Sequence, residues 1–237
     1  TEYYSSAMTL YDDASSFNIN NRIVFLSEAW DIVHPNQKLA GGGRSYCEIG
    51  SNECREYKAV LGNYFDHITC VDIDVNADVD LNSVNSLNAK ADVIAMYYVM
   101  EHVGNIADML KKCYDHLNEN GILVIEVPNI ESYTDNASPL ELLEHVNHFS
   151  PISLMNVCGR NGYKAVHFSR RMASRDYGFA VAFIKGEMSL ENSIGLINKA
   201  SVKEAWDKLE EVRPMNIHKL VQSFCMAETV LWCANDM

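Results

Sequence analysis

Tyr46-Cys47-Glu48-Ile49-Gly50-Ser51-Asn52-Glu53 is a short apolar run that ends in an acid and a glycine and then continues into a helical pattern. We expect a strand over 45–49 and a loop at Gly50. A glycine lets backbone approach a ligand where a Cβ would clash. The helix that follows offers unpaired N–H groups at its start. The stretch therefore predicts the first strand and the first ligand-binding loop of an α/β domain.

Downstream, short apolar runs alternate with helical patterns, which is typical of a parallel sheet with helices on both faces. The predicted strands of this part are Ser45–Ile49, His67–Val71, Val79–Leu81, Asp92–Tyr97 and Ile122–Val127. The predicted helices are Asn20–Val33, Glu53–Asn63, a helix from Ile106 that stops at Asn120-Gly121, Leu140–His145 and Ser153–Gly159. Only seven residues separate Asp72 from Asp80, so the second crossover is expected to be a loop or a single turn.

The final strands are expected to run antiparallel. Tyr163–Phe168 and Gly178–Ile184 are strand-like, and the polar segment between them is too short for a helical crossover. The tail from Ser189 predicts a pair of helices, which could form a homodimer contact or a lid. We therefore divide the chain into a helical lead over 1–43, an α/β core over 44–186 and a helical extension over 187–237.

In this order and spacing the chain resembles the class I S-adenosylmethionine-dependent methyltransferases. The resemblance implies a Rossmann-like, mostly parallel seven-stranded sheet with an antiparallel last strand, helices on both faces and S-adenosyl-L-methionine as cofactor. A second run, Leu143-Glu144-His145-Val146-Asn147-His148-Phe149-Ser150-Pro151 followed by Ser153-Leu154 and Gly162-Tyr163, resembles bacterial methyltransferases that act on sugars and related small molecules. A dehydrogenase is disfavoured because Gly50 does not open a G-x-G-x-x-G loop.

The cofactor residues are expected at strand ends. By resemblance, Glu48 would hold the methionyl ammonium and Asp72 would hold the ribose hydroxyls. A carboxylate can accept hydrogen bonds from both hydroxyls at once. Asp74 is the rival of Asp72. The alternatives are an exposed acid beside a turn glycine for Glu48, a loop aspartate for Asp80 and a side chain that faces the core for Tyr97. The full predicted set is Glu48, Gly50, Asn52, Asp72, Ile73, Asp80, Leu81, Met96 and Tyr97.

The predicted catalytic residues are His145 and His148, which could share one helical face. An imidazole can take a hydroxyl proton near neutral pH as the methyl group arrives. The alternatives are that both histidines pack, or that they bind a metal with Glu144; no third ligand stands at convincing spacing, so no metal is expected. For His102 a packing role is favoured. The predicted substrate contacts are Tyr11, Tyr98 and Asn129.

Composition narrows the partners and the compartment. The net charge is −13, with 19 Lys+Arg against 32 Asp+Glu, which disfavours a nucleic-acid substrate. No apolar run approaches the roughly 20 residues that span a bilayer, so membrane insertion is not expected. The start of the chain does not resemble a signal peptide. Seven cysteines without a C-x-x-C pair suit reduced thiols. We expect a soluble, cytoplasmic protein.

Together these features predict a methyltransferase that acts on a small hydroxylated acceptor. The first choice is O-methylation of a saccharide or sugar nucleotide in polysaccharide or specialised-metabolite biosynthesis. Carbon or nitrogen methylation of a related small molecule is the close variant. A noncatalytic partner subunit that keeps the fold and the cofactor is the third reading.

Overall fold

The computed structural model describes residues 19–51, 54–132, 144–170 and 177–211. The chain forms two compact units, 1–196 and 197–237. In the second unit the described residues belong to helix α7 (Leu190–Glu211), which begins in the first unit. In the described parts of the chain, no helix combines the length and the hydropathy needed to cross a membrane.

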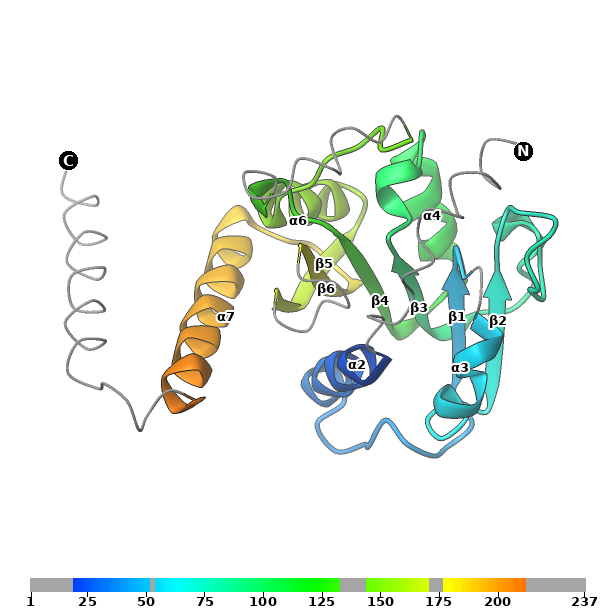
Figure 1. Ribbon diagram of the computed structural model, residues 1–237, viewed down its shortest axis with the longest axis horizontal. Coiled ribbons are helices and arrows are strands. Elements are labelled where there is room, and N and C mark those ends of the chain that lie inside the picture. The colour runs from blue at the N-terminus through cyan, green and yellow to red at the C-terminus, as the bar shows by residue number, and fades with distance from the viewer. Residues whose placement is uncertain (1–18, 52–53, 133–143, 171–176, 212–237) are drawn as a thin grey trace. The chain divides into compact units, whose positions relative to one another are not determined.

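A six-stranded sheet forms the centre of the first unit, in the order β2-β1-β3-β4-β6-β5 (Figure 1). The strands are β1 (Ser45–Ile49), β2 (His67–Val71), β3 (Ala91–Tyr97), β4 (Leu117–Pro128), β5 (Tyr163–Ser169) and β6 (Gly178–Lys185). The first four are parallel, while β6 runs antiparallel to both β4 and β5. The α/β class and the antiparallel end are confirmed.

The described part of the chain has a sheet of six strands where seven were predicted, because the predicted strand Val79–Leu81 is not formed. Within the described residues this segment makes one isolated bridge, between Val71 and Leu81. The amides of Asp80 and Leu81 both donate to the carbonyl of Cys70, at 3.0 and 3.1 Å. The short connection therefore folds straight back onto the end of β2 and has no length left for a separate strand.

Helices lie on both faces of the sheet (Figure 1). One face carries α2 (Ile19–Val33) and α3 (Cys54–Leu61), and the other carries α4 (Ile106–His116) and α6 (Pro151–Arg160). Successive side chains of a strand point to opposite faces of the sheet. Tyr46 of β1 belongs to the apolar cluster that contains Phe25 and Leu26 of α2. Ser150 begins α6 with a capping box, followed by a proline at the first helical position.

Helix α4 ends earlier than its apolar periodicity predicts. The helix ends at His116, and Leu117 already pairs with Ala91 in the sheet. The side chain of Asn118 donates to Asp92 Oδ1 at 2.7 Å, which ties this early part of β4 to β3. Tertiary pairing overrides the helical pattern here, so the predicted stop at Asn120-Gly121 is wrong.

Candidate active site

The glycine after β1 is required by its backbone and by its neighbour. Gly50 has a φ of 73°, and a Cβ placed on it would lie 2.3 Å from Cγ2 of Val99, which follows β3. Its amide donates to the carbonyl of Val71 at 2.7 Å. The loop after β1 is therefore held between the ends of β2 and β3, at the edge where open α/β sheets bind ligands.

The segment after β2 combines a carboxylate with exposed apolar side chains. Asp72 is partly buried, and its Oδ1 accepts the amide of Asp74 at 2.9 Å. The side chains of Ile73 and Val75 are 73% and 71% exposed. A carboxylate beside apolar surface suits a ligand with hydroxyl groups next to a flat ring. Asp72 and Ile73 thus lie where a nucleoside could reach both.

Asp80 is held by protein groups. Its Oδ2 accepts the amide of Cys70 at 2.7 Å and the ammonium of Lys58 at 2.8 Å. These bonds fasten the returning loop to β2 and α3. They give Asp80 a structural role, and its contact with an adenine ring stays a prediction, as does that of Leu81.

Helix α2 covers a buried polar cluster formed by its own Arg22 with Tyr46, Glu48 and Tyr97 of the sheet. Glu48 is 3% exposed; its Oε2 accepts the Tyr46 hydroxyl at 2.6 Å, and its Oε1 lies 3.6 Å from Nη1 of Arg22. The guanidinium of Arg22 lies 3.5 Å from the ring centroid of Tyr97. Burial raises the pKa of Glu48, against the opposing effects of Arg22 and Tyr46. Burial lowers the pKa of Arg22, but the attraction of Glu48, Tyr97 and Glu126 outweighs it and the net pKa is raised.

This cluster changes the reading of two predicted cofactor residues. Glu48 and Tyr97 are both buried beneath Arg22, so each has a packing role. Their contact with the cofactor stays a prediction. Met96, the other predicted residue of β3, is fully buried and faces the α4 and α6 side of the sheet. Asn52 and Tyr11 lie outside the described residues.

Two predicted substrate residues lie at the ends of β3 and β4. Tyr98 has a φ of 57°, and a Cβ on Gly178 would lie 2.2 Å from its hydroxyl. Asn129 is buried, accepts the amide of Glu131 through Oδ1 at 3.2 Å, and bridges to Phe149. Both residues therefore shape the turns at this edge, and their contact with a substrate stays a prediction.

Histidines from two segments meet beyond β3. His102 belongs to the single-turn 3-10 helix η3 (Met100–His102), and its ring centroid lies 4.7 Å from that of His145. The rings of His145 and His148 are 6.5 Å apart. Residues 144–150 are not helical, so the expected helical face for His145 and His148 is wrong, and 140–143 lie outside the described residues.

Asn147 joins these two segments. Its side-chain amide donates to the carbonyls of Met100 and Val103, at 3.2 and 2.7 Å, and its backbone amide donates to the carbonyl of Glu101 at 3.0 Å. A loop segment without helix geometry is thereby held in register against η3. The histidine arrangement therefore depends on a residue that the sequence pattern did not single out.

Glu101 and His102 complete the arrangement. Glu101 is 1% exposed, and its Oε1 lies 4.0 Å from Nε2 of His102. The Nδ1 of His102 lies 3.1 Å from the carbonyl of Glu144. Burial lowers the pKa of His102, and the Glu144 carbonyl partly offsets this. The sequence pattern favoured a packing role for His102 and did not predict this cluster. The pattern that could have indicated it is Glu101-His102, which follows the end of β3 by a few residues.

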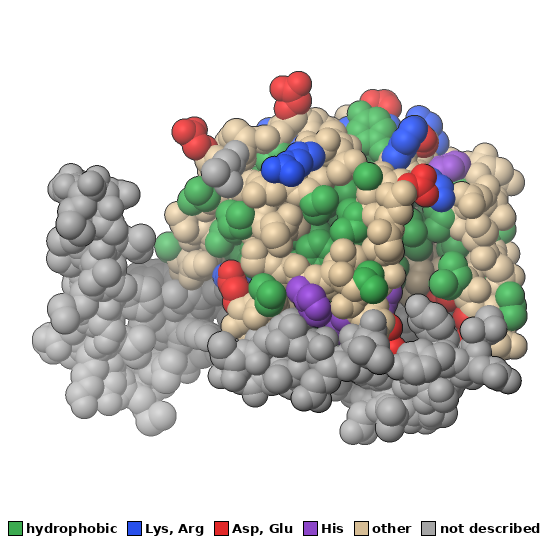
Figure 2. Space-filling model, turned by 90° about the horizontal axis from the view of Figure 1, so that it is seen from above, with side chains coloured by type: hydrophobic (Ala, Val, Ile, Leu, Met, Phe, Trp, Pro, Cys, Tyr) green, Lys and Arg blue, Asp and Glu red, His purple; other side chains and the backbone are tan. Residues whose placement is uncertain are grey.

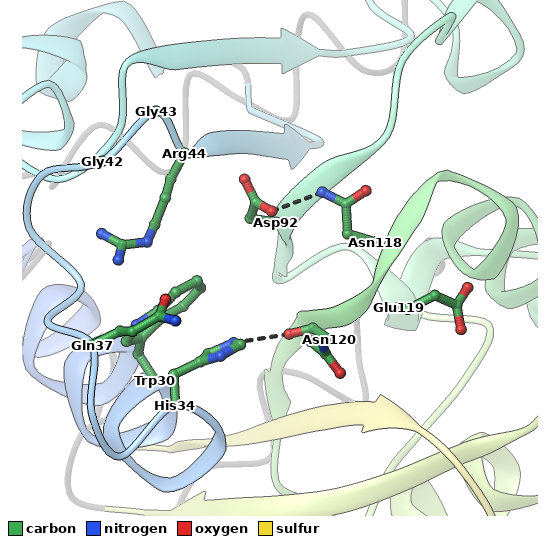
Figure 3. A pocket seen from close by; sticks show the side chains of 10 residues that line it. All are labelled: Trp30, His34, Gln37, Gly42, Gly43, Arg44, Asp92, Asn118, Glu119 and Asn120. Atoms are coloured by element: carbon green, nitrogen blue, oxygen red, sulfur yellow. Dashed lines mark hydrogen bonds between the residues drawn. The ribbon is translucent and has the colours of Figure 1, made fainter.

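A hollow of about 530 Å³ lies at the amino ends of the strands, away from this cluster (Figure 3). Arg44 packs 4.6 Å from the Trp30 ring centroid and donates to the carbonyl of Leu39 at 2.5 Å. His34 stacks on Trp30 and lies 2.9 Å from the carbonyl of Asn120. Asp92 accepts from Ser45 and Asn118. These polar groups hold the fold together, so volume alone does not make the hollow a reactive site.

The face over α4 and α6 has mixed charge (Figure 2). Basic side chains are interspersed with acidic and apolar ones, and on the described part of this face they do not gather into one patch. The described part of this face therefore has no continuous basic strip, and the expectation that nucleic acid is not a partner stays a prediction.

Comparison with known families gives one match. The sequence profile of a family described as "Methyltransferase domain" matches residues 25–168. No curated protein matches the chain significantly.

Solved structures share the fold at low sequence identity. The plantazolicin methyltransferase BpumL, solved in complex with SAH, is 13% identical with a TM-score of 0.57, over 77% of this chain and 90% of its own. A SAM-dependent methyltransferase from Archaeoglobus fulgidus is 15% identical with a TM-score of 0.53, over 74% of this chain and 99% of its own. An S-adenosylmethionine-dependent methyltransferase from Clostridium acetobutylicum is 9% identical with a TM-score of 0.57, over 77% and 99%. At these identities the likeness is one of fold.

Proposed function

Because this chain belongs to the methyltransferase-domain family and its cofactor is S-adenosylmethionine, we propose that it methylates a hydroxyl group of a small acceptor, namely a saccharide or sugar nucleotide. The observation that carries the proposal is the group of three histidines beyond β3, two of which come from the segment after β4. Hydroxyl acceptors must lose a proton during the transfer, and imidazole suits that task.

The described residues fit the cofactor. Gly50 keeps the loop after β1 free of a side chain, Asp72 offers carboxylate oxygens to sugar hydroxyls, and Ile73 offers exposed apolar surface to an adenine ring. When bound, S-adenosylmethionine supplies a methyl carbon on a positively charged sulfur, which leaves as a neutral thioether. The chain's own task is then to align the acceptor and to exclude competing water.

The proton of the acceptor goes to His148, and His145 is the neighbouring imidazole, with a ring centroid 6.5 Å away. The side chain of His148 is exposed and that of His145 is partly buried, so His148 is the more accessible of the two imidazoles. Asn147 is a positioning residue, because its three hydrogen bonds hold the segment between the two histidines against η3. Tyr98 and Asn129 are proposed to shape the acceptor side, and Tyr11 to reach it from the lead.

A sugar-type acceptor is favoured over nucleic acid by charge. The chain carries −13, and a polyanion would gain little from 19 basic side chains set among 32 acidic ones. A neutral saccharide avoids this repulsion. A sugar nucleotide carries few phosphates, so the repulsion is smaller than for a polymer. We propose a role in polysaccharide or specialised-metabolite biosynthesis, because the run from Leu143 to Pro151 resembles methyltransferases that act on sugars.

The test is a transfer assay with methyl-labelled S-adenosylmethionine. The acceptor panel holds sugar nucleotides and free saccharides, with small amines, peptides and tRNA as comparison classes. We expect label in a base-stable methyl ether of a saccharide-containing acceptor. Label only in amines, peptides or tRNA would overturn the acceptor class. Cofactor binding without transfer to any class would instead favour a noncatalytic partner subunit.

A further inference from the structure

We propose that Glu101, His102 and His145 form a binding site for one divalent transition-metal ion of the Zn²⁺ type. One ligand atom from each of these side chains lies within 4.8 Å of the other two. Two imidazoles and one carboxylate are a ligand set that Zn²⁺ uses in catalytic centres. Metal–ligand bonds of about 2.0–2.2 Å would require these atoms to close by roughly an ångström, which side-chain rotation can supply.

The orientation of His102 supports metal binding. Its Nδ1 lies 3.1 Å from the carbonyl of Glu144, and a carbonyl can only accept, so Nδ1 carries the proton. The remaining Nε2 then presents a lone pair toward Glu101, whose Oε1 is 4.0 Å away. This separation is too long for a hydrogen bond. A histidine that donates its other N–H to a backbone carbonyl is the usual arrangement around a bound metal.

Glu101 is placed to take part in such a site. Its side chain is 1% exposed, and one of its carboxylate oxygens lies among the ligand nitrogens of His102 and His145. An ionised carboxylate is a ligand that Zn²⁺ takes alongside imidazole. The sequence placed no third ligand beside His145 and His148. The structure places Glu101 and His102 of η3 next to His145, although the two segments are distant in the sequence.

The ligand count also suggests what the ion would do. Zn²⁺ takes four ligands, so three protein ligands leave one position for water or substrate. The cluster lies beyond the strand ends, on the side where the acceptor is proposed to bind. An acceptor hydroxyl in the fourth position would lose its proton more readily, and the nearby exposed His148 could receive it. This role rests on the proposed function, whereas metal binding itself does not.

The experiment measures metal binding without cofactor or acceptor. The full chain is stripped with a chelator, and Zn²⁺ is titrated by calorimetry, with Co²⁺ as the spectroscopic probe. We expect about one ion per chain and a visible Co²⁺ spectrum typical of nitrogen and oxygen ligands. Glu101→Gln and His145→Ala should each weaken Zn²⁺ binding about tenfold or more. The matched control is His67→Ala, which removes an exposed histidine at the start of β2.

Several outcomes would overturn the site. One is that the stripped chain binds no Zn²⁺, and another is that Co²⁺ shows absorption bands of thiolate ligands. The others are that Zn²⁺ binding is unchanged in both Glu101→Gln and His145→Ala, or that it falls equally in His67→Ala. His145 is partly exposed, so His145→Ala keeps the test valid if Glu101→Gln unfolds the protein. Failure of the saccharide assay with intact Zn²⁺ binding would reject the acceptor class alone. Failure of Zn²⁺ binding with intact transfer would reject the metal alone.

Discussion

The two ends of the central strands carry polar side chains of different kinds. At the amino end, Arg44, Asp92 and His34 each contact backbone or side-chain groups that hold the lead and the strands together. At the carboxyl end, Glu101 and the imidazoles of His102 and His145 face one another from two chain segments. The hollow of about 530 Å³ lies at the first end and the cluster of Glu101, His102 and His145 at the second, so a cavity and a group of titratable side chains lie in different places.

The largest expected effect is on catalysis at the carboxyl end. His148→Ala should lower kcat about a hundred- to ten-thousandfold, because the acceptor proton loses its base. The measurement is single-turnover methyl transfer with an active acceptor. Binding of S-adenosylhomocysteine should not change. His34→Ala, at the amino end, is the control and should keep kcat; an equal loss in both variants would remove the distinction between the two ends.

The buried pair under α2 should give the largest change in stability. Arg22→Met leaves Glu48 buried without its cation and should cost about 3–5 kcal/mol in the free energy of unfolding. Adding Glu48→Gln should recover part of this loss, since an amide is neutral. Denaturant unfolding measures both, and strictly additive costs would contradict a coupled pair.

The pH dependence of Arg22→Met follows from the raised pKa of Glu48. A carboxyl whose folded pKa lies above its unfolded value contributes stability below that unfolded value, and loses it as pH rises through the folded pKa. Without Arg22, which lowers the pKa of Glu48, this loss should grow. The deficit relative to wild type should therefore be smaller in acid and larger toward neutral pH.

Two glycines separate backbone strain from steric contact. Gly50→Ala combines a positive φ, which costs about 1–2 kcal/mol, with a clash against Val99 that should add about 1–3 kcal/mol. Gly41→Ala has a similar φ of 80° with no atom within 4 Å, so only the first cost applies. Equal unfolding free energies for the two variants would show that Val99 can move away.

The smallest expected effect is the titration of His102. Its pKa is lowered by burial, so its contribution to stability is present above the unfolded value of 6.5 and is lost as pH falls through the folded pKa. Wild type should therefore lose stability relative to His102→Gln as the pH drops below 6.5. Thermal unfolding across this range measures the difference, and parallel curves would contradict a neutral, partly buried imidazole.

The local parts of the fold were predictable from sequence. Strand β2 has the predicted bounds, and the antiparallel end followed from a connection too short for a crossover. The end of α4 did not, because the pairing of Leu117 with Ala91 joins residues that no local pattern connects. The spacing of apolar residues indicates which face of a helix or strand is buried. It does not indicate which other element packs against that face.

The site was predictable in its residue types more than in its arrangement. His145 and His148 were found by their spacing, but their partners Glu101 and His102 belong to another segment. Glu48 has the position of a ligand in the sequence, yet Arg22 from α2 covers it. Such pairings depend on how helices and loops dock on the sheet, which is decided by packing over the whole unit.

We propose that the carboxyl ends of β1, β2 and β3 hold the cofactor, with Asp72 on its sugar hydroxyls. Calorimetric titration with S-adenosylhomocysteine tests it most directly, on wild type, Asp72→Ala and Gln37→Ala, whose side chain lines the amino-end hollow. We expect Asp72→Ala to bind about tenfold or more weakly, through loss of charge-assisted hydrogen bonds, and Gln37→Ala to bind like wild type. Unchanged affinity in Asp72→Ala, or a loss confined to Gln37→Ala, would contradict it.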